Sequence, residues 1–225
     1  MKTPALVTFD VYAALLDIEG TLVSLVSDAL NLAAAEATPL VRLWRAKQLE
    51  RAATSNSLGG PRTSFRDCTA MALDYVARRH DLDIPQSQRR NLCAAWDRLN
   101  PWPDAVQTIE NLNARGITTA VLSNGDQDML EAVVAHIKAP FDHVLSSETC
   151  GVYKPHPDIY ALPAKTLGVP VEVTVHVAGG ANDVLGAKVF GMTCIWSNRL
   201  GDVLVDPAYP PDHEVTCLAD IARLL

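Results

Sequence analysis

The sequence predicts an α/β fold in which a doubly wound parallel sheet carries an inserted, all-helical second domain. Three observations support this prediction. Residues 5–9 form a short apolar run with the length of a strand that is buried on both faces. From about residue 21 to residue 99 the apolar spacing is helical throughout. Beyond residue 101, helical and strand patterns alternate, which is typical of parallel βα units.

These patterns divide the 225 residues into two predicted domains. Residues 1–16 and 101–225 form the α/β core, and residues 17–100 form the helical domain. A chain of this length can bury a sizeable core without disulfides or metal ions. The five cysteines are scattered and show no CxxC spacing, so we expect free thiols.

In the helical domain, turn residues and apolar spacing predict separate helices. Pro39 has a favourable position at the start of one of them, because the first helical turn tolerates a missing N–H group. The segment at residues 55–61, which contains two glycines and a proline, breaks the pattern. The expected helices cover residues 23–37, residues 39–54, residues 64–79 and residues 86–99.

In the core, each predicted strand is followed by a helical pattern. The expected strands cover residues 5–9, 118–123, 143–146, 173–178 and 193–196. Two of the expected helices end at residues 115 and 137, and two others cover residues 157–167 and 183–190.

Ligands of open parallel sheets bind beyond the carboxyl ends of the strands, so the residues that end each strand are the candidates for ligand contact. Asp10 ends the first predicted strand, and Ser123 and Asn124 end the second. The loop at residues 178–183 follows a later strand, and a long loop carries Lys154. We therefore expect a carboxylate, a hydroxyl, an amide and an ammonium group to converge at one edge of the sheet.

Charge and hydropathy limit the kinds of partner that the protein is expected to bind. The 19 basic and 26 acidic residues give a net charge of −7, which argues against nucleic acid or an anionic membrane but leaves a small anionic ligand open. The apolar run that begins at Leu22 is interrupted by Asp28, and Asp10 and Asp17 interrupt the region where a signal peptide would be apolar. We expect a cytoplasmic protein with no membrane partner.

Five sequence blocks, in order along nearly the whole chain, resemble the haloacid dehalogenase superfamily and within it the L-2-haloacid dehalogenase branch. The blocks are Phe9-Asp10-x-Tyr12 with Leu15 and Asp17, Leu43-Trp44-Arg45-x-Lys47-Gln48-Leu49-Glu50, Val121-Leu122-Ser123-Asn124-Gly125, Val152-Tyr153-Lys154-Pro155 with Tyr160, and Asp183 with Gly186-Ala187. The resemblance implies a Rossmann-like core under a helical cap, a nucleophilic aspartate, no metal or other cofactor, and a homodimer.

The resemblance also implies roles for individual residues. Asp10 would be the nucleophile, and Lys154 and Asp183 would be the other catalytic residues, which support Asp10 and the hydrolytic water. The residues implied to bind substrate are Tyr12, Arg45, Ser123, Asn124 and Tyr160. Asn182 stands where the family has an aromatic residue, and its amide is expected to join the substrate-binding residues.

The chemistry of these residues allows the implied roles, but each residue also has a common structural role. A carboxylate such as Asp10 can form an ester with a carbon that bears a leaving group, or it can cap the following turn. Lys154 within about 4 to 6 Å of Asp10 would balance the negative charge of that carboxylate, whereas a loop lysine is otherwise solvated. Arg45 shares a helical stripe with Val41 and Leu49, so it either binds an anion or extends to solvent.

Two features argue against a magnesium-dependent phosphatase of the same superfamily. Such enzymes resemble this chain at Asp10 but carry a second aspartate two residues later, where this chain has Tyr12. A phenol does not replace that acid at neutral pH. The loop at residues 178–183 offers only Asp183 as an acidic ligand, and magnesium prefers several carboxylate oxygens.

The chain departs from the family pattern at several positions. Ala13-Ala14 replaces Gly-Thr, and Ala178 and Gly180 replace a serine and an asparagine that position water. Asn182 replaces an aromatic residue of the halide pocket. The favoured prediction is hydrolysis of short 2-haloacids through an aspartyl ester. Ring opening of azetidine-2-carboxylate, magnesium-dependent phosphatase activity and non-catalytic ligand binding remain alternatives.

Other polar and aromatic candidates are expected to be structural. His176 lies inside an apolar strand, where a buried histidine with satisfied nitrogens is more common than a base. Trp96 and Trp102 are expected to pack in the core or at the domain hinge.

Overall fold

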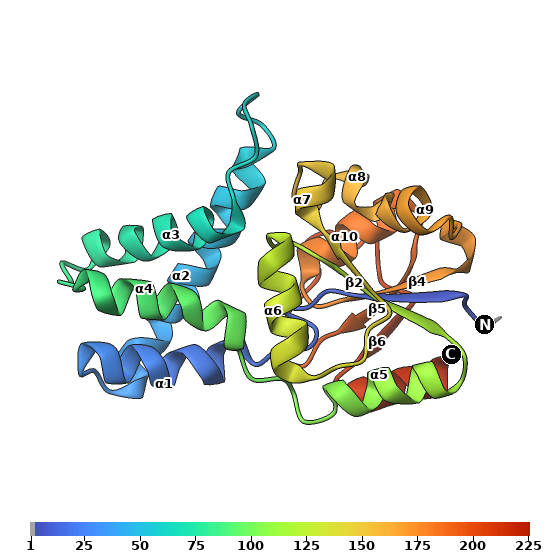
Figure 1. Ribbon diagram of the computed structural model, residues 1–225, viewed down its shortest axis with the longest axis horizontal. Helices are drawn as coiled ribbons and strands as arrows, with labels where there is room; N and C mark the ends of the chain where they lie inside the picture. The colour runs from blue at the N-terminus through green and yellow to red at the C-terminus, as the bar shows by residue number, and fades with distance from the viewer. Residues whose placement is uncertain (1–2) are drawn as a thin grey trace.

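The computed structural model describes residues 3–225 and has two bodies, a sheet flanked by helices and a group of helices beside it (Figure 1). In this described part of the chain, six strands form one sheet in the order β3-β2-β1-β4-β5-β6, and every neighbouring pair is parallel. The strands are β1 (Leu6–Phe9), β2 (Thr118–Ser123), β3 (His143–Ser146), β4 (Thr174–Ala178), β5 (Thr193–Ser197) and β6 (His213–Val215). The predicted fold class is confirmed.

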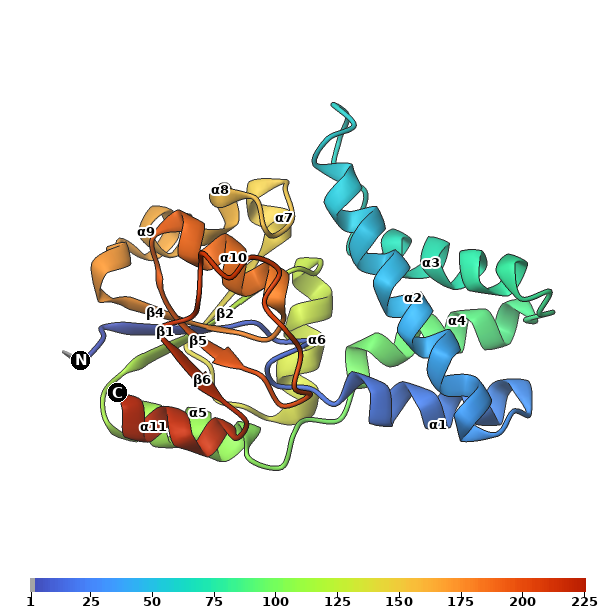
Figure 2. The same cartoon turned by 180° about the vertical axis from the view of Figure 1, so that it is seen from behind.

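Helices cover both faces of the sheet, which is why the central strands are buried along their whole length (Figures 1 and 2). Successive side chains alternate between the faces. Val7 and Phe9 pack with one group of helices, whereas Leu6 packs with the other. The first group is α5 (Ala105–Ala114), α6 (Gln127–Ile137) and α11 (Ile221–Leu224); the second is α8 (Pro157–Tyr160), α9 (Leu162–Leu167) and α10 (Ala181–Phe190).

The helical body contains α1 (Ile18–Leu30), α2 (Ala34–Ser55), α3 (Phe65–Arg79) and α4 (Gln86–Ala94), followed by the 3₁₀ turn η1 (Ala95–Arg98). The buried indole of Trp44 packs edge-on against that of Trp96, with ring centroids 5.5 Å apart. The Trp44 indole N–H also donates to the Thr69 carbonyl at 2.8 Å. These contacts join α2, α3 and η1 into one apolar unit.

The chain passes between the two bodies twice, at neighbouring points. Leu16 and Pro101 form an isolated antiparallel bridge. The Asp17 N–H donates to the Asn100 carbonyl at 2.8 Å, and the Trp102 N–H donates to the Leu15 carbonyl at 2.8 Å. The outgoing and returning segments therefore form one short paired crossing.

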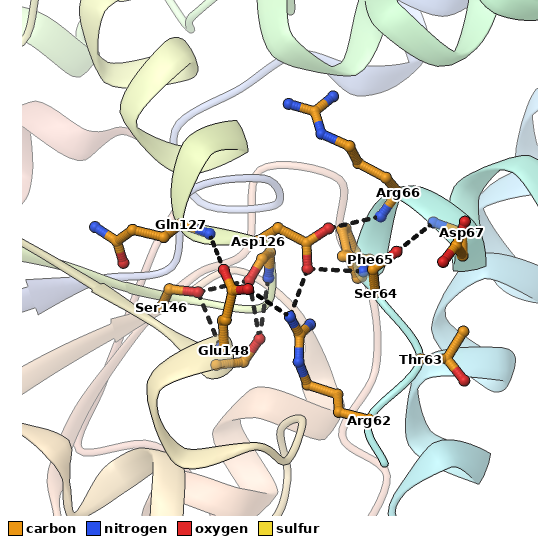
Figure 3. Close-up of polar contacts among 12 residues, drawn as sticks. Arg62, Thr63, Ser64, Phe65, Arg66, Asp67, Asp126, Gln127, Ser146 and Glu148 are labelled. Atoms are coloured by element: carbon orange, nitrogen blue, oxygen red, sulfur yellow. Dashed lines mark hydrogen bonds and ion pairs between the residues drawn. The ribbon is translucent and has the colours of Figure 1, made fainter.

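A second connection lies away from this crossing, at the N-terminal ends of α3 and α6 (Figure 3). Asp126 Oδ1 accepts hydrogen bonds from the Phe65 N–H at 2.9 Å and from Arg62 Nη2 at 2.7 Å. Asp126 Oδ2 accepts from the Arg66 N–H at 3.0 Å. The Asp126 latch, as we call these four residues, satisfies free donors of the first turn of α3 with a carboxylate from the sheet body.

Several predicted helix boundaries were wrong. The predicted helix at residues 23–37 is interrupted because Asn31 adopts a left-handed conformation with φ of 52°, which ends α1. Helix α2 then begins at Ala34, so Pro39 lies inside it instead of at its start. The predicted helix at residues 157–167 is divided, because α9 begins anew with Pro163 in its first turn.

The remaining differences concern short elements and one cap. Strand β6 and the one-turn helix α7 (Ser147–Cys150) were not predicted, because such short segments carry no periodic pattern. Helix α10 begins at Ala181 with Gly180 as its N-cap, two residues before the predicted start at residue 183. Within residues 3–225, no single helix meets the length and hydropathy needed to cross a membrane; α1 and α2 do so only as a pair, bent by 115°.

Candidate active site

A cavity of about 550 Å³ lies at the carboxyl ends of the central strands, between the sheet body and α2. This is the edge where ligands of parallel sheets bind. A second cavity of about 340 Å³ adjoins it and shares Arg45 and Gly180 with it. The residues that line the larger cavity include Asp10, Tyr12, Ala13, Arg45, Leu49, Ala53, Asn124, Lys154, Asn182, Asp183, Val203 and Val205.

Asp10 follows β1 directly, and donors surround its buried carboxylate. Ser123 Oγ donates to Oδ1 at 2.8 Å, and the Ala13 N–H donates to Oδ2 at 3.0 Å. Lys154 Nζ lies 3.5 Å from Oδ1. The carboxylate is therefore fixed in orientation, and its negative charge has a cation beside it.

Gly179 allows the turn after Asp10 to approach the end of β4. A Cβ atom at this position would lie 2.2 Å from the backbone nitrogen of Ala14, which is closer than any side chain can be accommodated. Only glycine therefore permits the backbone geometry that lets the Ala13 N–H reach Asp10.

Lys154 lies between two carboxylates. Its Nζ donates to Asp183 Oδ2 at 2.9 Å in addition to its contact with Asp10. Its backbone N–H donates to Asn124 Oδ1 at 2.8 Å, which ties the lysine loop to the end of β2. The side chain is only 6% exposed, so solvent screens these charges weakly.

Asp183 lies in the first turn of α10, and side chains of the candidate site surround its carboxylate. Tyr160 Oη donates to Oδ1 at 2.9 Å, while Lys154 and His176 both contact Oδ2. Burial alone would raise the pKa of Asp183, but Lys154 and His176 hold that pKa well below its usual value. Gly186 makes the contact with Tyr160 possible, since a Cβ there would lie 2.4 Å from the phenol oxygen.

The roof of the cavity is aromatic and cationic. The Arg45 guanidinium lies 5.7 Å from the ring centre of Tyr12 and 5.4 Å from that of Trp96. Its Nη1 donates to Gln48 Oε1 at 2.6 Å, and Gln48 Nε2 in turn donates to Thr69 Oγ1 at 2.6 Å. Arg45 is thus held over the cavity by stacking and by a hydrogen-bond chain and does not extend to solvent.

The structure distributes the remaining expected residues between the cavity wall and the layer behind it. Asn124 and Asn182 line the cavity, and Asn182 is exposed in it. Ser123 is fully buried, with its hydroxyl directed at Asp10, and Tyr160 is buried behind Asp183. Tyr12 lines the cavity, and burial raises the pKa of its phenol far above the usual value, so it stays protonated.

Three residues near the site were not singled out for it by the sequence. Gln48 and Trp96 hold Arg45, and His176 contacts both Lys154 and Asp183. A signal for His176 existed, because it precedes Ala178 by two residues and therefore shares a sheet face with the end of β4. Gln48 had a signal too, because it lies four residues after Trp44 and four residues before Ala52 on the buried face of α2.

Comparisons with known proteins agree with this geometry. A family model described as haloacid dehalogenase-like hydrolase matches residues 11–191. An (S)-2-haloacid dehalogenase of Pseudomonas sp. (strain YL) is 34% identical over 220 residues, covering 97% of this chain and 93% of the relative. Haloacetate dehalogenase H-2 of Moraxella sp. (strain B) is 31% identical over 227 residues, covering 100% and 99%.

A solved structure extends the similarity to three dimensions. The L-2-haloacid dehalogenase of Xanthobacter autotrophicus with chloropropionic acid covalently bound superimposes with a TM-score of 0.83 at 30% identity, over 98% of both chains.

Proposed function

The chain belongs to the haloacid dehalogenase-like hydrolase family, and from this membership we propose that it hydrolyses short 2-haloacids to 2-hydroxy acids. The observation that carries the proposal is the Asp10 carboxylate, held beside Lys154 in a cavity whose roof is Arg45. A nucleophilic anion and a binding cation on opposite walls suit a substrate that has a carboxylate next to the carbon under attack.

In the first half of the reaction, Asp10 attacks the carbon that bears the halogen, the carbon–halogen bond breaks, and the halide leaves with inversion at carbon. Oδ1 of Asp10 has two donors, Ser123 and Lys154, whereas Oδ2 has the Ala13 N–H alone. This donor count supports Oδ2 as the attacking oxygen, because it is the less stabilised of the two. The product is an ester on Asp10 and a free halide.

The anionic parts of the substrate meet two cations and two amides. Arg45 binds the substrate carboxylate, because its planar fork suits two oxygens and its aromatic neighbours limit its hydration. Asn124 and Asn182 line the same cavity and supply further donors for the carboxylate or the departing halide. The contact of Ser123 with Asp10 supports a role in orienting the nucleophile.

In the second half, water attacks Cγ of Asp10 and the Cγ–Oδ2 bond of the ester breaks. One proton of the water passes to the departing alkoxide oxygen, which leaves as the hydroxyl of the product, and the other is released to solvent, so the Asp10 carboxylate is regenerated. Negative charge develops on Oδ1 in this step, where the Ser123 hydroxyl and the Lys154 ammonium stand ready to stabilise it. Asp183, ionised and adjacent to Lys154, orients the attacking water.

The alternative functions are not favoured. For a magnesium-dependent phosphatase, the place between the Asp10 and Asp183 carboxylates is taken by the Lys154 ammonium, and Tyr12 stands where an acid is required. The relatives compared above are named 2-haloacid and haloacetate dehalogenases, which favours neither azetidine ring opening nor a non-catalytic role.

Three further proposals concern the protein's binding partner, its location and its oligomeric state. With a net charge of −7, its partner is a small anionic substrate and not nucleic acid or membrane. We propose the cytoplasm as its location. The homodimer implied by family resemblance stays a prediction, which a molar-mass measurement by light scattering of the purified protein would test.

The decisive experiment compares three reactions of the same preparation: halide release from (S)-2-chloropropionate, ring opening of azetidine-2-carboxylate, and phosphate release from a phosphate monoester. We expect halide release alone, and we expect its loss in Asp10→Asn. Phosphate release that requires magnesium would replace the proposal with the phosphatase function.

A further inference from the structure

His176 is completely buried in β4, directly behind Lys154. Its Nε2 lies 3.0 Å from Asp183 Oδ2 and 3.2 Å from Lys154 Nζ. Its Nδ1 lies 2.8 Å from Oγ1 of Thr8, the residue in register with it on the neighbouring strand β1. Both ring nitrogens are therefore in contact with polar groups, and Nε2 contacts two charged groups of the site.

The two charged neighbours of Nε2 make opposite demands on the ring. The contact with Asp183 needs a proton on Nε2, whereas the contact with the Lys154 ammonium needs a lone pair there. The shorter contact, 3.0 Å to the carboxylate, favours the tautomer with the proton on Nε2, in which Nε2–H donates a hydrogen bond to Asp183 and Nδ1 accepts one from the Thr8 hydroxyl. Burial lowers the pKa of His176, so the ring stays neutral and does not add a second positive charge beside Lys154.

The donation from His176 completes the set of bonds that fixes Asp183. One carboxylate oxygen accepts from Tyr160, and the other accepts from both Lys154 and His176. Without the imidazole, the carboxylate would lose one of its two fixed donors on Oδ2 while its charge stayed buried.

Formation of the ester changes what holds Lys154. Before the reaction, the ammonium has two anionic partners, Asp10 and Asp183. The ester removes the negative charge of Asp10, so Asp183 becomes the remaining anionic partner of the ammonium within the site. The position of Lys154 during the second half-reaction therefore depends on the orientation of Asp183.

We propose that His176, oriented by Thr8, is a positioning residue for ester hydrolysis: it holds Asp183, and through it Lys154, in place after the charge of Asp10 has been consumed. This inference rests on the proposed 2-haloacid hydrolysis. It assigns to a strand histidine and its neighbouring threonine a role in the second half-reaction and none in the displacement of halide.

The test measures the two half-reactions separately in His176→Leu, His176→Gln and Thr8→Val. Halide release after rapid mixing with (S)-2-chloropropionate reports the displacement, and intact-mass analysis of the quenched steady state reports the fraction of enzyme held as the Asp10 ester. Glutamine places an amide N–H near the position of Nε2, so it retains the donor to Asp183, whereas leucine removes it.

We expect the first-turnover halide burst of His176→Leu to keep the wild-type rate while its steady-state rate falls about tenfold to a hundredfold, with the ester as the dominant enzyme form. His176→Gln should recover most of the hydrolysis rate. Thr8→Val, which is close in shape to threonine, should shift the ester fraction in the same direction as His176→Leu, but less.

A burst that slows in parallel with the steady state, or equal ester fractions in the leucine and glutamine variants, would overturn the inference. If His176→Leu does not fold, as judged by near-ultraviolet circular dichroism, an unchanged ester fraction in folded Thr8→Val has the same force. Absence of halide release from the wild-type protein would instead contradict the proposed function, so the two failures are distinguishable.

Discussion

Replacement of Asp126 by alanine should weaken the connection between the two bodies. Its side chain is 9% exposed, and that of its ion-pair partner Arg62 is 10% exposed. Asp126→Ala also removes the acceptor of two backbone N–H groups at the start of α3. Arg62 keeps an ion pair with Glu148 at 3.5 Å, so its charge stays compensated. The loss therefore comes from three hydrogen bonds to the Asp126 carboxylate, which at about 1 to 1.5 kcal/mol each amount to about 3 to 5 kcal/mol.

The assay is urea unfolding, followed by circular dichroism, of wild type, Asp126→Ala and the matched control Asp128→Ala. Asp128 is also acidic and also contacts the helical body, through Arg66 at 2.9 Å, but its side chain is 70% exposed. A surface pair of this kind contributes about 0 to 1 kcal/mol. We expect Asp126→Ala to lose about 3 to 5 kcal/mol of unfolding free energy and the control at most about 1 kcal/mol.

Asp126→Ala should also have a kinetic effect, because the helical body carries Arg45. Asp126→Ala should raise KM for the 2-haloacid more than Asp128→Ala does. Equal losses of stability in the two variants would refute the argument, since it rests on the difference in burial between two carboxylates that contact the same domain.

Four other outcomes are expected. Asp10→Asn should abolish halide release and keep the wild-type circular dichroism spectrum, with mass spectrometry used to exclude deamidation. Arg45→Lys should lower kcat/KM strongly at an almost unchanged Tm, because lysine keeps the charge but loses the planar fork and the stacking. Incubation with a chelator should leave halide release unchanged, and recovery by added magnesium after a loss would contradict this. For Asp183, whose folded-state pKa is lowered, the stabilisation is fully present above the unfolded pKa of about 3.9 and is lost as pH falls further. The difference in unfolding free energy between wild type and Asp183→Asn should therefore be constant from about pH 8 to pH 5 and shrink below about pH 4.

The sequence was most informative where a local rule fixes the position of a side chain. Strand ends of parallel sheets meet at one edge, so the approach of Asp10, Ser123 and Asn124 to one another follows from two apolar runs and their lengths. The long loop that carries Lys154 was expected at the same edge, but no such rule fixes its position, and the role of the lysine beside Asp10 was implied by the family resemblance.

The sequence was least informative where packing between distant segments decides the outcome. The partners of Arg45 and Gln48 depend on how α2 lies against α3 and η1, which no spacing within α2 encodes. The histidine in β4 was recognised as buried, but its charged neighbours come from two other segments. The partner of Asp126 lies about 60 residues away along the chain, and only the folded structure relates them.

The connections between the bodies have a mechanical consequence. A rigid body held at one point can turn about any axis through that point, whereas a body held at two points can turn only about the line through both. The paired crossing at Leu16 and Pro101 and the Asp126 latch supply two such points, and the hydrogen bonds between the Asn56 amide and the Tyr153 backbone are a third contact between the bodies. Any rigid rotation of the helical body that keeps the first two is therefore described by one angle. Arg45 moves with that domain while Asp10 does not, so the same angle sets the span between the cation that grips the acid and the oxygen that attacks it.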